Sequence, residues 1–96
     1  MRESVIERYL VKRVKEAGGE VRKVKWIGRR GAPDRLVMLP DPGPGGGTFN
    51  NAWWVELKAP GEPLEPHQSR EHARMRRMGQ RVLKIDSLEQ VDELLK

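Results

Sequence analysis

Two short apolar segments carry charged residues where a buried strand tolerates them least, and this feature limits the folds open to the chain. The first segment, residues 35–39, directly follows Asp34, and the second, residues 52–58, contains Glu56 and Lys58. Both segments have the apolar, β-branched and aromatic composition of strands. The fold therefore has to bring two carboxylates and an ammonium next to its interior.

Strand alternation places these charges on one side of a predicted sheet. Because successive side chains of a strand point to opposite faces, Glu56 and Lys58 share one face while Val55 and Leu57 turn into the core. The two segments are predicted to be antiparallel neighbours, which brings Asp34 into the same region without requiring it to lie directly opposite. Carboxylates within a few Å repel one another unless a proton or a cation neutralises them. Oxygen ligands suit Mg²⁺ or Mn²⁺, and a nearby ammonium can position a water or stabilise charge on a phosphate.

An ordinary ion pair is the alternative explanation for these residues. Glu56 could pair with Lys58, or Asp34 with Arg35, at the edge of the sheet. An isolated Glu-x-Lys in a strand usually has that meaning. The Pro33-Asp34 pair, the strand–loop–strand arrangement and the basic composition together favour a metal site instead.

Length and composition narrow the class of protein. A chain of 96 residues forms one domain, spanning 1–96. Its 19 Lys and Arg residues against 14 Asp and Glu residues give a net charge of +5, which fits a polyanionic partner such as nucleic acid and fits a merely solvated surface equally well. The absence of cysteine excludes disulfides and thiolate metal sites. No apolar run approaches the ~18 residues of a membrane span, and the N-terminus lacks a signal-peptide core. We therefore expect an intracellular protein without a membrane partner.

Hydrophobic periodicity and turn residues predict the element order αβββαβα. A helix at residues 4–17 has apolar residues at three- and four-residue steps, and Ser4 and Glu7 have the spacing of a capping box. The Gly- and Pro-rich residues 41–51 are predicted to form a flexible hairpin loop. The other predicted elements are strands at 20–27, 35–39, 52–58 and 81–85, a helix at 66–78, and a helix from Ser87 to the C-terminus.

This motif and this order resemble the PD-(D/E)XK nucleases, whose restriction-endonuclease-like α/β core has the order αβββαβ. Here an additional helix would follow at the C-terminus. The chain is more closely similar to the VRR-NUC family, in its standalone phage and bacterial form. The loop at 41–51 departs from the tighter hairpin of many relatives. The matching residues span Ser4 to about Leu94 and comprise Ile6-Glu7, Gly18-Gly19, the block from Gly28 to Arg35, the block from Val55 to Pro60, and Gln68.

The resemblance implies roles for the residues of the charged motif. Asp34 and Glu56 would be the carboxylates that bind Mg²⁺ or Mn²⁺, with the backbone carbonyl of Leu57 as a further ligand. Lys58 would be the catalytic lysine. These four residues form the predicted centre of the site.

The resemblance also assigns two residues from the helices. Glu7 resembles the additional acidic residue of the family, which can join the metal site, and Gln68 resembles the polar residue near the lysine. On the residues alone, Glu7 could equally be the capping-box partner of Ser4. Gln68 could likewise be a solvated glutamine in the first turn of a helix.

Arginines near the motif and along the second helix are predicted to contact DNA phosphates. Arg35 has an alternative, because it is adjacent to Asp34 and could be its local ion-pair partner. The predicted DNA-binding set is Arg29, Arg30, Arg35, Arg70 and Arg74.

The histidines and tryptophans have less specific patterns. His67 and His72 are five residues apart, which misses the spacing of a helical metal pair, so we expect them at the surface. The tryptophans could stack on bases. Packing is the favoured role for Trp26 and Trp53, whereas Trp54 falls on the Glu56 face, nearer the site.

For function, the resemblance implies a metal-dependent endodeoxyribonuclease that hydrolyses phosphodiester bonds. It further implies a homodimer that resolves four-way (Holliday) junctions in the cytoplasm, which would be the host cytoplasm if a phage encodes the protein. The alternatives are a nicking or flap endonuclease and a non-catalytic DNA-binding module. A sequence-specific restriction enzyme is disfavoured, because a chain this short has little room for a separate base-reading element. A module that only binds DNA has no reason to keep two acids and a lysine together.

Overall fold

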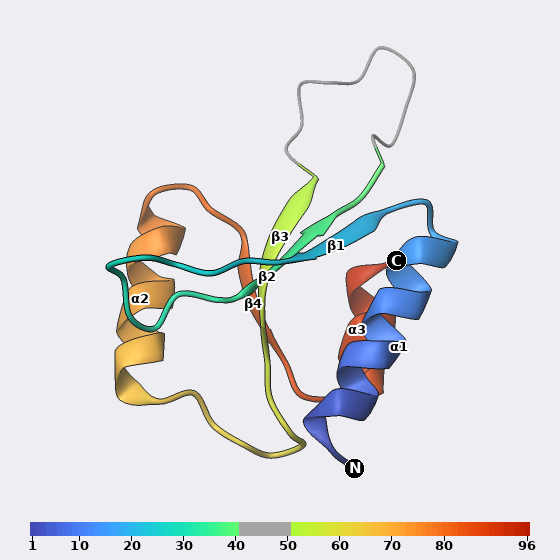
Figure 1. Ribbon diagram of the computed structural model, residues 1–96, viewed down its shortest axis with the longest axis horizontal. Helices are drawn as coiled ribbons and strands as arrows, with labels where there is room; N and C mark the ends of the chain where they lie inside the picture. Colours follow the sequence, from blue (N-terminus) through green and yellow to red (C-terminus); the bar gives the residue numbers. More distant parts are fainter. Residues whose placement is uncertain (41–50) are drawn as a thin grey trace.

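Four strands form a single sheet in the computed structural model, which describes residues 1–40 and 51–96 (Figure 1). β1 (Glu20–Lys23), β2 (Arg35–Met38), β3 (Ala52–Leu57) and β4 (Val82–Ile85) lie side by side in this order. The β1–β2 and β2–β3 pairs are antiparallel, and β3 and β4 are parallel. A parallel pair needs a long crossover, and α2 (Pro66–Arg77) lies within that connection.

The three described helices cover the two faces of the sheet unequally. α1 (Glu3–Glu16) and α3 (Leu88–Leu94) pack together on one face, and α2 lies on the other (Figure 1). The residues that α2 buries are Glu71 and His72, both polar. The sheet therefore has an apolar side under α1 and α3 and a charged side under α2.

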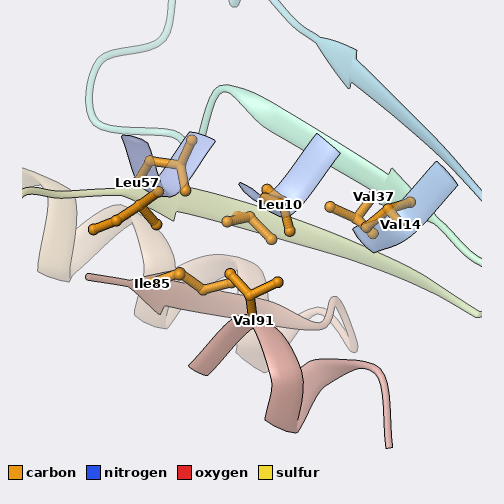
Figure 2. Close-up of a cluster of buried hydrophobic side chains, with 8 residues drawn as sticks. Leu10, Val14, Val37, Leu57, Ile85 and Val91 are labelled. Atoms are coloured by element: carbon orange, nitrogen blue, oxygen red, sulfur yellow. The ribbon is translucent and has the colours of Figure 1, made fainter. Parts of the chain in front are cut away.

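One cluster of buried side chains fills the apolar side (Figure 2). Val55 and Leu57 of β3 belong to it, as strand alternation predicts. Removing such side chains from water is the main source of stability for a domain of this size. The cluster consists of Ile6, Leu10, Val14, Val37, Val55, Leu57, Ile85 and Val91.

The predicted α/β class and the order αβββαβα are confirmed over the described residues, and α3 is the expected additional helix. The predicted hairpin loop at 41–51 lies, apart from Asn51, outside the described residues. Among the helices that the structure describes, none is both long and apolar enough to cross a membrane.

The predicted first strand is shorter than expected. β1 ends at Lys23 rather than at residue 27, because the chain leaves the sheet there and turns toward α2 before β2 begins (Figure 1). Gly28 and Gly31 have φ angles of 75° and 89°, a region that glycine occupies without strain. A Cβ atom on Gly31 would lie 2.7 Å from the carbonyl oxygen of His67, so this turn packs directly on α2.

The predicted capping box at Ser4 is wrong, whereas the predicted start of the last helix at Ser87 is confirmed. Ser4 does not cap α1, because the helix already begins at Glu3 and its N-cap is Arg2, without a side-chain cap. At α3, Ser87 is the N-cap, and its Oγ accepts a hydrogen bond from the Gln90 amide at 3.2 Å.

Candidate active site

The register of β2 and β3 brings the two predicted metal-binding carboxylates together. The β2–β3 pairing ends with Arg35 and Val55, and continuing it by one residue sets Asp34 opposite Glu56, whose pKa the charge of Asp34 raises. Directly opposite residues of an antiparallel pair have Cβ atoms roughly 5 Å apart. The Asp34 carbonyl accepts a hydrogen bond from the Val24 amide at 2.8 Å, which fixes the backbone at the start of β2. Glu56 is therefore held within β3, and Asp34 is held directly before β2.

Glu56 is a carboxyl group in an environment that opposes its negative charge. Its side chain is 13% exposed. Burial, and secondly the charge of Asp34, raise its pKa to about 7, although the positive charges of Lys58 and Arg35 act in the opposite direction. The site thus concentrates negative charge that these two cations do not fully balance.

This shifted pKa predicts that the protein loses stability as the pH rises. Between the ordinary pKa of 4.5 and about 7, Glu56 binds a proton in the folded state that it has lost in the unfolded state, so unfolding becomes easier with increasing pH. The effect is absent below 4.5 and complete above 7, where it amounts to at most about 3 kcal/mol. Glu56→Gln keeps the shape and removes the charge.

Urea denaturation without divalent cations checks this expectation. Glu56→Gln should be more stable than the wild type at about pH 8 and no more stable at about pH 4.5. Equal stabilities at both pH values would show that Glu56 ionises freely in the folded protein.

Lys58 lies on the same face as Glu56 and directly follows β3. It is 8% exposed, its amide donates to the carbonyl of Ile85 at 3.0 Å, and its Nζ lies 4.0 Å from the Glu62 carboxylate. A buried ammonium is costly unless anions surround it. Its charge acts on Glu56, so the acid-acid-lysine set predicted from the sequence is assembled in one place.

Glu7 reaches this region through Arg35. The Nη2 atom of the Arg35 guanidinium is bonded to the Glu7 carboxylate, and its Nη1 atom lies 2.9 Å from Asp34 Oδ1. The capping alternative for Glu7 is wrong, because α1 begins before Ser4. Glu7 is connected to Asp34 through an arginine, and its predicted place at the metal stays a prediction.

The same geometry corrects the predicted role of Arg35. Its side chain is only 9% exposed and is engaged by two carboxylates, so it is the local ion-pair partner rather than a DNA contact. Period two explains this result, since Arg35 follows Asp34 and points to the opposite side of the sheet, toward α1.

Gln68 lies in the first turn of α2, where its side chain has a structural partner. Its Oε1 accepts a hydrogen bond from the Glu65 amide at 2.8 Å, as half of a capping box. Within residues 1–40 and 51–96, no hydrogen bond or ion pair joins the Gln68 side chain to Lys58. Its predicted role beside the lysine therefore stays a prediction.

His72 corrects the prediction of a surface histidine. It is fully buried under the sheet, and its Nε2 lies 3.9 Å from Glu56 Oε1. Within the described part of the chain neither ring nitrogen has a hydrogen-bond partner of normal geometry, although the Gly31 backbone is close enough to favour the charged form. Burial, and then the charge of Arg76, lower its pKa, so a neutral imidazole borders Glu56. A signal did exist, because His72 follows Gln68 by four residues and shares its helix face.

Glu3 is a second residue that the sequence interpretation missed. Its charge adds to the upward shift of the Glu56 pKa, so the first turn of α1 contributes to the field at the site. Glu3 precedes Glu7 by four residues, which places both acids on one helix face.

The remaining predicted DNA contacts lie on or near α2. Arg29 and Arg74 are about half exposed and lie 3.6 and 2.8 Å from the Glu71 carboxylate. Arg30 and Arg70 are exposed. These four arginines stay predicted contacts.

The carboxylates of Asp34 and Glu56 suit a hard divalent cation, but they provide only part of its coordination. Asp34 and Glu56 supply carboxylate oxygens from facing positions, which is the ligand chemistry of Mg²⁺ and Mn²⁺. In residues 1–40 and 51–96, no three His, Asp or Glu side chains are arranged around one point. The Leu57 carbonyl, water and a phosphate of the substrate would have to complete the coordination.

Known proteins similar to this chain include one phage protein and one solved domain. No model of a known protein family matches the sequence. The chain is 45% identical over 87 residues to the protein named "Putative nuclease p44" of Acyrthosiphon pisum secondary endosymbiont phage 1, an alignment that covers 91% of this chain and 85% of that protein. A solved structure described as a VRR_NUC domain superposes with a TM-score of 0.79 and 39% identity, over 97% of this chain and 92% of the other.

Proposed function

The chain belongs to the VRR-NUC family of nucleases, and from this premise we propose that it is a divalent-metal-dependent endonuclease that hydrolyses phosphodiester bonds of DNA. The observation that carries the proposal is the register that sets Asp34 opposite Glu56, with Lys58 on the same face. The net charge of +5 supports a polyanionic substrate.

The residues of the site have two roles, which are binding of the cation and stabilisation of the negative charge on the phosphate. Asp34 and Glu56 would hold the cation, which when bound supplies Lewis-acid stabilisation of the phosphate and lowers the pKa of water. Lys58 donates a proton or a hydrogen bond at Nζ toward the reacting phosphate group and stabilises the negative charge that develops there. Arg35 holds Asp34 in place and keeps Glu7 beside it.

Cleavage in the presence and absence of a chelator tests this proposal. Labelled DNA should be cut with Mg²⁺ or Mn²⁺ and remain intact with EDTA, while binding persists in both. Binding without any cutting in either metal would leave the non-catalytic DNA-binding module as the explanation.

For the substrate, we propose a four-way junction cut by a homodimer. One site cuts one strand, so coordinated cutting of two strands needs two sites, and a two-fold dimer supplies them symmetrically. A junction has a matching two-fold symmetry, so its shape rather than its base sequence would select it. Two chains of net charge +5 also give the dimer +10, and binding should weaken steeply with salt.

Light scattering together with a matched cleavage series tests this assembly. We expect a dimeric mass at micromolar concentration and faster cutting of opposing strands of a junction than of linear duplex. A monomeric mass, or equal rates on the two substrates, would favour the nicking or flap endonuclease instead.

A further inference from the structure

Trp26 and Trp54 form an aromatic pair on the charged side of the sheet. Their ring centroids are 5.2 Å apart, with the planes tilted by 53°. The Trp26 indole N–H donates to the Pro33 carbonyl at 2.8 Å, and that of Trp54 donates to Gln80 Oε1 at 3.0 Å. Both indole N–H groups are therefore engaged, which fixes the orientation of the rings.

A cavity of about 420 Å³ opens beside this pair and combines an apolar wall with a cationic rim. Met78, the residue that directly follows α2, adds to the wall, and Arg29, Arg74 and Arg77 supply the positive charge. The acid in the lining is Glu71, which is buried and paired with Arg74 at 2.8 Å and with Arg29 at 3.6 Å. The net charge of the lining is positive.

A neighbouring cavity reaches the candidate active site. A second cavity, of about 600 Å³, shares Trp26 and Arg29 with the first and reaches Asp34. Lys23 and Lys25 add two further positive charges to it. Along β3, Trp54 precedes Glu56 by two residues, or roughly 7 Å, a span that one nucleotide of an extended strand can bridge.

We propose that the cavity at Trp26 and Trp54 binds one unstacked nucleobase of the DNA strand whose phosphate lies at Asp34 and Glu56. Aromatic side chains stack on any base, and arginines beside them hold the flanking phosphates, so such a cavity accepts a base without reading its identity. The inference rests on the proposed nuclease function and refines its substrate. DNA with a free base beside the cut, as at a branch point, binds better than continuous duplex.

Binding of a short oligothymidylate, compared with an abasic strand of equal length and charge, tests the base contact. The measurement is made in EDTA by tryptophan quenching and anisotropy, so it does not depend on cleavage. The wild type should bind the oligothymidylate about 10-fold more tightly than the abasic strand. Trp54→Ala should lose this preference, and Trp54→Phe should keep part of it.

Two arginine variants separate base stacking from charge. Arg77→Ala should weaken both strands alike, because it removes a phosphate contact. Arg8→Ala, with the same charge change on the exposed surface of α1, is the control and should weaken neither as strongly.

Equal wild-type affinity for the two strands would overturn the proposal, and this comparison needs no variant. If the base preference holds but no metal supports cutting, the nuclease proposal fails while the base site stands. If cutting occurs without a base preference, the base site alone is wrong.

Discussion

Asp34→Ala and Glu56→Ala are each expected to abolish DNA cleavage and to leave DNA binding intact or tighter. Each variant deletes one of two facing carboxylates, so a divalent cation loses half of the side-chain ligands that the sheet offers it. Removing the negative charge also removes repulsion toward the phosphate, which favours binding. Single-turnover cleavage and anisotropy with the same labelled DNA measure the two effects separately.

An exposed acid provides the matched control for this pair of variants. Glu93→Ala makes the same charge change on α3, where Glu93 is paired with Lys96 at the surface. It should cut at the wild-type rate. Cleavage by Asp34→Ala or Glu56→Ala at that rate would show that the metal is held elsewhere.

Lys58→Met is expected to lower turnover by ~10²-fold or more while metal binding survives. Methionine keeps most of the length of the buried side chain, so the fold should tolerate the change. The loss of the ammonium removes a proton donor and a positive charge from the place where negative charge develops. Cleavage rate and Mn²⁺ affinity, measured on the same preparation, check this expectation.

Other outcomes for Lys58→Met would assign the lysine a different role. Loss of Mn²⁺ binding with no separate effect on turnover would mean that Lys58 only supports the carboxylates. Unchanged turnover would remove it from the chemistry altogether.

The centre of the site could be predicted because strand alternation is a local rule. The spacing of Glu56 and Lys58 placed them on one face, and Val55 and Leu57 are buried on the other, as expected. The register that brings Asp34 to Glu56 could not be predicted from the sequence, since a slip by one residue would move every side chain of the strand to the other face. The sequence motif identified the residues of the site, but their relative positions follow from the pairing of the strands.

The surroundings of the site could not be predicted, because they depend on contacts between distant elements. Arg35 meets Glu7 across 28 positions of sequence, and no local pattern records such a pair. His72 is buried because α2 lies over the sheet, and the polar composition of that helix gave no sign of a buried face beyond the four-residue spacing of His72 from Gln68. The shortened β1 has the same origin, since the turn at Gly31 packs on α2.

Calorimetric titration of Mn²⁺ into the metal-free protein at about pH 8, where Glu56 is ionised, tests most directly whether this sheet holds a catalytic cation. The wild type and Lys58→Met should bind Mn²⁺ with similar affinity, and Asp34→Asn and Glu56→Gln, which keep the side-chain shape, should lose binding. Wild-type affinity in Asp34→Asn or Glu56→Gln would contradict a metal site at these two carboxylates.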